Sequence, residues 1–523
     1  MEGLTYCLET FGCQMNVLDS QLVEGQLRAC GMSPVQAYRD ADVILFNTCS
    51  VRQHAEDKVL SRLGYVRRYK QKRPEVIIGV IGCMAERMKE KLFSTAPYVD
   101  LLCGPGELHR LPALLADVHQ RHERVTALAG SRSRRTEVLQ RALEYDSLEA
   151  LDLSRTPGPE DNVLQSYVRV QRGCDKFCTF CVVPFTRGPE RSRPPSHIID
   201  EAKMLVARGC REITLLGQTV NSYLHQENGR PLRFAQLLER VHQIEGLDRL
   251  RFVTSFPADW DEDIFRVMRD CPRVCSYLHI PAQSGSERIL KAMRRGYTAA
   301  EYLKLMDAAR KYVPDISLAG DFVVGFCGES EADFAATVDM VRRVEYKSLF
   351  VFKYSPRPGT VADRNNRDDV PNAVKARRNN ELLALQSEIS LKQKQALVGR
   401  TVEVLVEGYS KAARKAVGQA VAVGQVESSR PAASPATSPP RPQDCEHDRG
   451  HEASADKSHQ LVGRTPGDLI TVFDGEESHI GALVRVRVAD ASPLTLFGRI
   501  EAVLSPSRNG LKPVDARSPT LLG

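Results

Sequence analysis

Three cysteines stand close together in the segment GCDKFCTFC, directly after a stretch that predicts a β-strand. Cys174, Cys178 and Cys181 have the spacing C-x3-C-x2-C. Cysteine thiolates hold iron–sulfur clusters, and three thiolates on one tight loop can bind three irons of a [4Fe–4S] cubane. The fourth iron then stays open to a ligand. The alternative is a structural zinc site, which needs a fourth ligand; Cys210 and His197 are available, but at no recognised spacing.

Three further cysteines are far apart in the sequence but occupy equivalent places in a repeating pattern. Cys13, Cys49 and Cys83 each follow one of the first three predicted strands, in the contexts ETFGC, FNTC and VIGC. The carboxyl ends of parallel strands lie at one edge of an open sheet, where ligands bind. We therefore expect these thiols to converge and to hold a second cluster with an open iron. Cys103, after a fourth strand, is a rival ligand, and unrelated burial of each cysteine is the alternative.

The N-terminal part of the chain alternates between strand and helix patterns, which predicts a parallel sheet with right-handed crossovers. The predicted strands are 4–11, 42–47, 76–81 and 99–102, and the predicted helices are 19–30, 54–72 and 86–92. We expect Asp19 or Ser20 to cap the first helix and Gly31 to end it. Residues 1–120 are predicted to form the first domain, and the Arg-, Ser- and Pro-rich residues 121–162 a linker.

A second run of strand and helix patterns extends from residue 163 to residue 397. Its candidate strands are SYVRVQ, REITLLG, LRFVTS, CSYLHIP, ISLAGDFVVG and LFVFKYS, and residues 371–397 predict a long helix. Six β/α units in one domain are typical of a barrel-like or partly open sheet. The predicted fold class is α/β: an N-terminal parallel βαβ sheet domain followed by a central partial (β/α)6 TIM-like barrel.

Short alternating strand patterns over residues 398–503 predict a small C-terminal β-barrel. It is interrupted at about 426–460 by a Pro- and Ser-rich segment whose composition cannot bury a core, so we expect a disordered insert there. The tail, residues 504–523, has a similar composition, so we expect it to be disordered as well.

The composition excludes several classes of protein. The chain has 523 residues, 14 cysteines and a net charge of +6. Its cysteines are too sparse for a small disulfide scaffold, and the mild positive charge permits an anionic partner without requiring one. Because we find no signal peptide and no stretch long enough to span a membrane, we expect a cytoplasmic protein whose thiols serve metal or redox chemistry.

The cysteine loop resembles the defining motif of the radical S-adenosylmethionine superfamily, C-x3-C-x-aromatic-C, with Phe180 in the aromatic place. The resemblance implies that the open iron binds the amino and carboxylate groups of S-adenosylmethionine. Reductive cleavage would then give a 5′-deoxyadenosyl radical that abstracts hydrogen. The resemblance also implies a partial TIM-like barrel, which agrees with the predicted six β/α units.

With two three-cysteine sets, the chain resembles the methylthiotransferase family over nearly its whole length except the insert and the tail. The matching motifs are TFGCQMNVLDS, NTCSVRQHAEDK, IGCMAER, SYVRVQRGCDKFCTFCVVPFTRG, TLLGQTVNSY, HIPAQSGSERILKAMRRGYT, GDFVVGFCGE and FKYSPRPGT. The resemblance implies two [4Fe–4S] clusters, the first of which handles sulfur. It also implies that one S-adenosylmethionine donates a methyl group, that another is the radical source, and that the closing barrel is an RNA-binding TRAM domain.

The residues after Cys13 and Cys49, QMN and SVR, resemble the MiaB branch of that family. This branch adds a methylthio group to C2 of isopentenyl-adenosine at tRNA position 37, beside the anticodon. C2 is an unactivated aromatic C–H, which radical chemistry can attack. Cys327 in GFCGE and Phe256 in TSFP depart from the usual proline and histidine.

Other functions stay open at this point. A methylthiotransferase could act on a ribosomal protein residue or on threonylcarbamoyl-adenosine in tRNA. A non-catalytic iron–sulfur RNA-binding protein and a zinc-stabilised binding protein are alternatives from other classes. The resemblance implies tRNA and an external electron donor as partners, together with a sulfur donor that the sequence does not identify, and we expect a monomer.

Polar residues at the ends of barrel strands are candidates for holding the nucleoside cofactor, because active sites of such barrels lie there. They are Gln218, Asn221, Ser255, Gln283, Ser284 and Asp321. Arg187, Arg191 and Arg193 follow the cysteine loop and are candidates for contacting substrate phosphate or cofactor carboxylate, with a solvated loop as the alternative.

In the last barrel, the strand VRVRV places Arg485 and Arg487 on one face, where they could bind RNA phosphates. An ordinary exposed strand face is the alternative. The eight cysteines outside the two sets of three are predicted to have no metal or catalytic role, and the pair Cys271 and Cys275 is predicted to be structural. Among them, Cys445 lies with His447 and His451 in the predicted insert.

Overall fold

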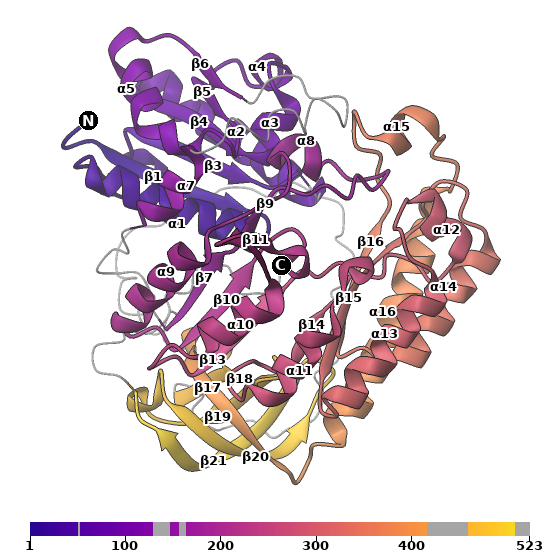
Figure 1. Ribbon diagram of the computed structural model, residues 1–523. Coiled ribbons are helices and arrows are strands. Elements are labelled where there is room, and N and C mark those ends of the chain that lie inside the picture. The colour runs from indigo at the N-terminus through magenta and orange to yellow at the C-terminus, as the bar shows by residue number, and fades with distance from the viewer. Residues whose placement is uncertain (51–52, 129–146, 156–163, 416–458, 508–523) are drawn as a thin grey trace, which may run out of the picture.

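The N-terminal part of the chain forms a parallel sheet, seen at the top of Figure 1. The computed structural model describes residues 1–50, 53–128, 147–155, 164–415 and 459–507. The strands of this sheet are β1 (Thr5–Phe11), β2 (Ser33–Pro34), β3 (Val43–Thr48), β4 (Ile77–Gly82), β5 (Leu101–Cys103) and β6 (Val125–Ala127). They are ordered β2-β1-β3-β4-β5-β6 and pair in parallel. The predicted parallel βαβ sheet is confirmed.

Helices cover both faces of this sheet because successive side chains of its buried strands point to opposite faces. In β3, Val43 and Leu45 belong to the core on one face, and Ile44 and Phe46 to the core on the other. The helices are α1 (Gln14–Ala29) and α5 (Leu111–Arg121) on the first face, and α2 (Gln53–Lys72), α3 (Cys83–Met88) and α4 (Lys91–Thr95) on the second.

The first helix starts earlier than the sequence predicted. α1 begins at Gln14 with Cys13 at its N-cap position, so the predicted caps, Asp19 and Ser20, are wrong. Asn16 N donates to the carbonyl oxygen of Cys13 at 2.9 Å, which starts the helix directly after β1. Asp19 instead lies in the middle of α1, and its buried side chain forms ion pairs with Arg169 and Arg187.

Two other segments differ from the sequence prediction. The predicted helix at 86–92 is divided into α3 and α4 near Lys89, whose φ is +51°. Within the predicted linker 121–162, β6 adds a parallel strand to the sheet, and α7 (Ser147–Leu153) contacts α1. These elements are too short to show a periodic pattern of hydrophobic residues in the sequence. Their secondary structure depends on packing against segments that are distant in the sequence.

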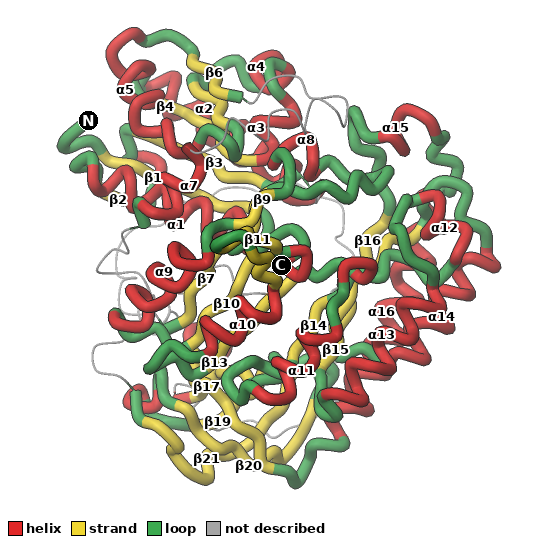
Figure 2. The backbone as a smooth tube through the Cα atoms, viewed as in Figure 1, coloured by secondary structure: helices red, strands yellow, loops and turns green. Residues whose placement is uncertain are grey.

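The central part of the chain is an open barrel of parallel strands surrounded by helices (Figures 1 and 2). Its strands among the described residues are β7 (Gln165–Arg169), β10 (Glu212–Leu216), β13 (Arg249–Val253), β14 (Tyr277–His279), β15 (Ser317–Val324) and β16 (Ser348–Lys353). β7, β10 and β13 form one parallel set and β14, β15 and β16 another. A parallel bridge between Leu250 and Val274 joins the two sets. This confirms the predicted partial (β/α)6 barrel.

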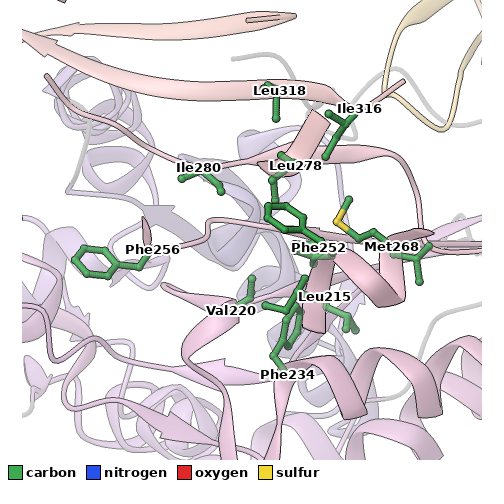
Figure 3. Close-up of a cluster of buried hydrophobic side chains, with 14 of the residues drawn as sticks. Leu215, Val220, Phe234, Phe252, Phe256, Met268, Leu278, Ile280, Ile316 and Leu318 are labelled. Atoms are coloured by element: carbon green, nitrogen blue, oxygen red, sulfur yellow. The ribbon is translucent and has the colours of Figure 1, made fainter. Parts of the chain in front are cut away.

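The helices of this domain lie on the outside of the barrel. They are α8 (Val183–Arg187), α9 (Pro195–Ala207), α10 (Phe234–His242), α11 (Glu262–Asp270), α12 (Glu287–Ala292), α13 (Ala299–Tyr312), α14 (Glu331–Val344), α15 (Val361–Asn365) and α16 (Asn372–Gln395). Short antiparallel pairs lie between them: β8 (Gln171–Arg172) with β9 (Arg191–Ser192), and β11 (Leu224–Glu227) with β12 (Arg230–Arg233). Figure 3 shows the core that strands and helices share, in which the rings of Phe234 and Phe252 meet edge to face at 5.2 Å.

The C-terminal part of the chain is a closed barrel, in the order β17-β18-β19-β21-β20, which confirms the predicted small β-barrel. Its strands are β17 (Thr401–Tyr409), β18 (Gln460–Arg464), β19 (Ile470–Asp474), β20 (Leu483–Ala491) and β21 (Thr495–Ser505). The predicted insert at 426–460 lies outside the described residues up to 458, and its last residue starts β18. The predicted tail, residues 504–523, lies outside them from 508, and its first two residues end β21.

The small barrel is attached to the amino ends of the strands of the open barrel, away from the first sheet (Figure 1). Arg249 Nη1 donates to the carbonyl oxygen of Arg464 at 2.6 Å, and Arg251 Nη2 to that of Thr465 at 2.6 Å. Asp468 completes the contact: its Oδ2 accepts from Lys347 Nζ at 2.6 Å. The interface therefore consists of buried charges that neutralise one another.

Asp468 should be the most sensitive position of this interface. Burial raises its pKa, but the charges of Lys347, Arg464 and Arg251 outweigh burial and hold the pKa below its usual value. We expect Asp468→Asn to lower the free energy of unfolding by about 3–5 kcal/mol, because it leaves buried cations without their partner. Urea denaturation followed by circular dichroism measures this, with Asp339→Asn on an exposed helix face as the control. Equal midpoints for the two variants would contradict the prediction.

The described residues contain no helix that is both long enough and apolar enough to cross a membrane.

Candidate active site

The structure brings Cys13, Cys49 and Cys83 together at one edge of the first sheet, and we call them the sheet-edge triad. Strand register explains this, because Phe11, Thr48 and Gly82 are aligned across β1, β3 and β4. Each cysteine comes one or two residues after that row. A Cβ atom on Gly12 would lie only 2.5 Å from the Cβ of Cys49, so the first strand end approaches the second closely.

The sheet-edge triad lies in a positive environment. A hydrogen bond from Cys49, the charge of Arg187 and backbone N–H groups at the start of α1 outweigh burial and lower the pKa of Cys13 to about 6. Burial raises the pKa of Cys83, and the charge of Arg187 opposes that effect. The thiolate is the form of cysteine that binds metals, so this edge of the sheet favours the ligand form of Cys13.

The rival ligand, Cys103, does not join the triad. It lies within β5 opposite Ile81, two residues before the position of Cys83 on the neighbouring strand. Its Sγ is buried and lies 3.7 Å from the carbonyl oxygen of Gly104. Burial raises the pKa of the Cys103 thiol, as it does for Cys174 and Cys181, so the strand register rather than the pKa separates Cys103 from the triad.

Cys174, Cys178 and Cys181 lie on one loop at the carboxyl end of the first barrel strand, and we call them the loop triad. Cys174 N donates to the carbonyl oxygen of Gly188 at 3.2 Å, which closes the loop on itself. Burial, and then the charges of the neighbouring cysteines, raise the pKa of Cys174 and Cys181. The three sulfurs are thus close enough to affect one another.

The two triads face each other across the boundary between the sheet and the barrel. α3, which Cys83 begins, contacts α8, which follows the loop triad. Cys83 also acts electrostatically on Cys181. The first sheet therefore lies beside the carboxyl ends of the barrel strands (Figure 1).

The donors in each triad fit an iron–sulfur cubane better than a zinc ion. Each triad offers three thiols, whereas a structural zinc ion needs a fourth ligand. The extra zinc ligands considered from sequence are engaged elsewhere: His197 Nδ1 lies 3.2 Å from Glu149 Oε1, and Cys210 Sγ lies 3.2 Å from the carbonyl oxygen of Glu212. A cubane spreads its thiolates over different irons.

The predicted cofactor residues lie at the carboxyl end of the barrel, and they differ in whether their polar atoms already have hydrogen-bond partners within the chain. Ser255 has a buried Oγ for which the structure gives no hydrogen-bond partner, so it is available to a bound molecule. Asp321 Oδ1 lies 3.1 Å from His279 Nε2. Gln218 is half-buried, and Gln283 is buried with a φ of +71°.

Two of the predicted cofactor residues stabilise the loops themselves. Asn221 Nδ2 donates to the carbonyl oxygen of Phe256 at 2.8 Å, and Asn221 Oδ1 accepts from Phe256 N at 2.7 Å. Ser284 Oγ accepts from Ser286 N at 3.2 Å and is fully buried. These bonds hold strand ends in place, and they use the polar atoms that the sequence assigned to the cofactor.

The arginines after the loop triad are not a solvated loop. Arg193 is buried and donates to Glu201 Oε2 at 2.7 Å and to Glu149 Oε1 at 2.8 Å, so its charge is neutralised by carboxylates of the chain. Arg187 is buried against Asp19. Arg191 is half-buried on β9. Contacts of Arg187 and Arg193 with substrate or cofactor, which the sequence suggested, are therefore replaced by internal ion pairs.

Three further residues near the triads were missed. Arg295 Nη1 donates to Cys178 Sγ at 3.2 Å, and its guanidinium lies 4.7 Å from the ring centre of Phe256, one of the two departures from the family pattern. Gln171 Nε2 is buried without a hydrogen-bond partner among the described residues, just before the loop. His279 pairs with Asp321. Arg295, Gln171 and His279 lie in the motifs RRG, VQRGC and HIP, respectively. The motifs alone do not show that these side chains lie near the triads, because that depends on how the fold packs.

Outside this region, Arg485 and Arg487 are exposed on the same face of β20, as the alternation predicted. Arg487 Nη1 lies 3.9 Å from Glu501 Oε1 on the neighbouring strand. Cys275 is buried and Cys271 half-buried. Residues Val51 and Arg52 of the SVR motif, and Cys445 with its two histidines, lie outside the described residues.

Two family models match separate parts of the chain. Residues 5–104 match the model of "Uncharacterized protein family UPF0004", and residues 168–341 match that of the "Radical SAM superfamily". The loop triad and most of the open barrel lie within the second match, which ends before β16. Among solved structures, the radical S-adenosylmethionine methyltransferase TsrM from Kitasatospora setae has a TM-score of 0.48 and 15% identity over 69% of this chain and 74% of that one.

Several curated proteins match over nearly their whole length. The tRNA-2-methylthio-N(6)-dimethylallyladenosine synthase of Rhodopirellula baltica is 43% identical over 97% of this chain and 98% of its own. The proteins of the same name from Carboxydothermus hydrogenoformans and Moorella thermoacetica are 38% and 40% identical, each over 95% of this chain and over 99% and 98% of their own lengths. The chain therefore belongs to the family of tRNA-2-methylthio-N(6)-dimethylallyladenosine synthases, within the radical S-adenosylmethionine superfamily.

Proposed function

We propose that this chain adds a methylthio group to C2 of isopentenyl-adenosine beside the anticodon of tRNA, and that each cysteine triad holds one [4Fe–4S] cluster. The observation that carries the proposal is the approach of the two triads, since α3, which Cys83 begins, contacts α8, which follows the loop triad. Two three-thiol sites leave one iron open at each. The loop triad would hold the [4Fe–4S] cluster that binds S-adenosylmethionine. The sheet-edge triad would hold the cluster that delivers sulfur.

The residues of the chain have distinct tasks in this reaction. When bound, S-adenosylmethionine and the cluster of the loop triad supply a carbon radical that can attack an unactivated C–H. Ser255 and Gln171 point unsatisfied polar atoms into a buried region and would orient the nucleoside part of the cofactor. The pair of His279 and Asp321 provides a second polar contact at the same strand ends.

The substrate assignment rests on the relatives, whose printed names all specify dimethylallyladenosine in tRNA. These names favour that substrate over a ribosomal protein residue and over threonylcarbamoyl-adenosine. Reconstituted enzyme should be incubated with S-adenosylmethionine, a reductant and tRNA that carries isopentenyl-adenosine. Mass spectrometry of the digested tRNA should show the added methylthio group. Matched tRNA that carries unmodified adenosine or threonylcarbamoyl-adenosine should stay unchanged, and modification of either one instead would refute the assignment.

For RNA binding, we infer that the exposed pair Arg485 and Arg487 contacts phosphates. Replacing both with alanine should weaken tRNA binding and reduce the slope of log affinity against log salt by about two, or about one per lost phosphate contact. Filter binding at several salt concentrations measures this. Arg342→Ala and Arg343→Ala together, on the exposed face of α14, provide a charge-matched control. An unchanged slope in the Arg485 and Arg487 variant would show that this strand face is only solvated.

A further inference from the structure

One buried carboxylate of the first domain is held by two arginines of the barrel domain. Asp19 lies on α1, the helix that Cys13 begins, and its side chain has an exposed fraction of 1%. Its Oδ1 accepts from Arg169 Nη2 at 2.8 Å, and its Oδ2 accepts from Arg187 Nη2 at 2.9 Å. Arg169 ends β7 and Arg187 ends α8. The two domains are therefore joined by a charged contact near both triads.

Arg187 reaches further than this ion pair. Its charge acts on both Cys83 and Cys13, and α8, which it ends, packs against α3, which Cys83 begins. The helix that it ends begins two residues after Cys181, and Val183 N donates to Cys181 Sγ at 3.5 Å. α8 therefore lies between the loop triad and the sheet-edge triad and contacts the helix that Cys83 begins.

The charges around Asp19 leave a positive excess beside the sheet-edge triad. One carboxylate faces two guanidinium groups, so it neutralises only one of them. Arg169 has a second carboxylate within reach, since its Nη2 lies 3.3 Å from Asp152 Oδ1. Asp152 in turn pairs with Arg172 and lies 3.5 Å from Arg193 Nε. Among these arginines, Arg187 is the one whose positive charge lowers the pKa of Cys13 and opposes the rise in the pKa of Cys83.

We propose that Arg187 is a positioning residue that fixes the sheet-edge triad relative to the loop triad and applies a positive charge to the cluster of the sheet-edge triad. A cluster held by three thiolates is anionic, and a buried cation beside it raises its reduction potential and favours binding of an anionic sulfur ligand. A fixed separation also lets a radical formed at one site reach a substrate beside the other. The inference rests on the proposed function only in assuming that both triads carry clusters.

The electrostatic part is tested on the cluster itself, without any substrate. In the full-length chain with the three loop-triad cysteines replaced by alanine, the remaining cluster can be titrated by EPR-monitored reduction. Arg187→Gln should make its potential more negative, and Arg187→Lys should restore most of the shift because the charge returns. Asp19→Asn should shift the potential in the opposite direction, because it removes a negative charge. A role in folding alone would not produce shifts of opposite sign.

The positioning part is tested on the intact enzyme with tRNA substrate. In Arg187→Gln the amount of methylthio product formed per 5′-deoxyadenosine should fall about 10- to 100-fold, as for other residues that support metal ligands. Arg342→Gln, on the exposed face of α14, is the control and should keep the wild-type ratio. An unchanged potential and ratio in Arg187→Gln, or shifts of the same sign in Arg187→Gln and Asp19→Asn, would overturn the proposal. If the wild-type enzyme modifies no tRNA at all, the proposed function fails while the potentials still decide this inference.

Discussion

Replacing Cys178 with alanine should remove about four of about eight irons from the reconstituted chain and abolish formation of 5′-deoxyadenosine from S-adenosylmethionine. Cys178 is the central ligand of the loop triad, and Arg295 donates to its sulfur at 3.2 Å. Two thiols are too few to leave a single defined open iron, so the cofactor loses its binding place. Iron analysis after anaerobic reconstitution and chromatography of the nucleoside products measure the two effects.

The matched control for this variant is Cys210→Ala. Cys210 is buried in the same domain, but its sulfur lies beside the carbonyl oxygen of Glu212 at the amino end of the barrel. Iron content and cofactor cleavage should match those of the wild type. If Cys210→Ala loses metal together with Cys178→Ala, a four-ligand zinc site would explain the loop better than a cluster. If Cys178→Ala keeps full cofactor cleavage, the loop triad is not the cofactor site.

The positions of the triads could be predicted from sequence because strand ends are local features. ETFGC, FNTC and VIGC each end a run of buried strand residues, and parallel pairing then aligns those ends without further information. The rejection of Cys103 needed the register, since its strand is shorter and the cysteine lies inside it. The six β/α units of the barrel could be predicted in the same way from alternating strand and helix patterns.

The environment of the triads could not be predicted, because it depends on contacts between distant segments. Asp19 looked like a helix cap, whereas its partner Arg187 is 168 residues away in the sequence. Asn221 looked available to a cofactor, but its amide is bonded to the backbone of Phe256 in the next strand end. A sequence pattern predicts which face a polar side chain lies on. Only the assembled fold shows whether an internal partner has already taken its hydrogen bonds.

Replacing Cys49 with alanine should separate the two halves of the reaction. The cluster of the sheet-edge triad should be lost, with about four irons per chain, while the loop triad and its barrel stay intact. Formation of 5′-deoxyadenosine should therefore continue, because it needs only the loop triad. Methylthio transfer to tRNA should fall by about 100-fold or more, since loss of a direct ligand costs at least as much as loss of a supporting residue.

Cys103→Ala is the sharpest control for this variant, because Cys103 lies at the same sheet and is equally buried but is set back within β5. It should retain both iron and methylthio transfer. If Cys103→Ala loses transfer and Cys49→Ala does not, the ligand set includes the rival cysteine and the strand-end argument fails. If both keep transfer, the sulfur does not come from this edge of the sheet. A Cys49→Ala enzyme that also stops cleaving S-adenosylmethionine would show that the triads act as one site. Such a loss would be consistent with the position of Arg187, which pairs with Asp19 and whose charge acts on Cys83.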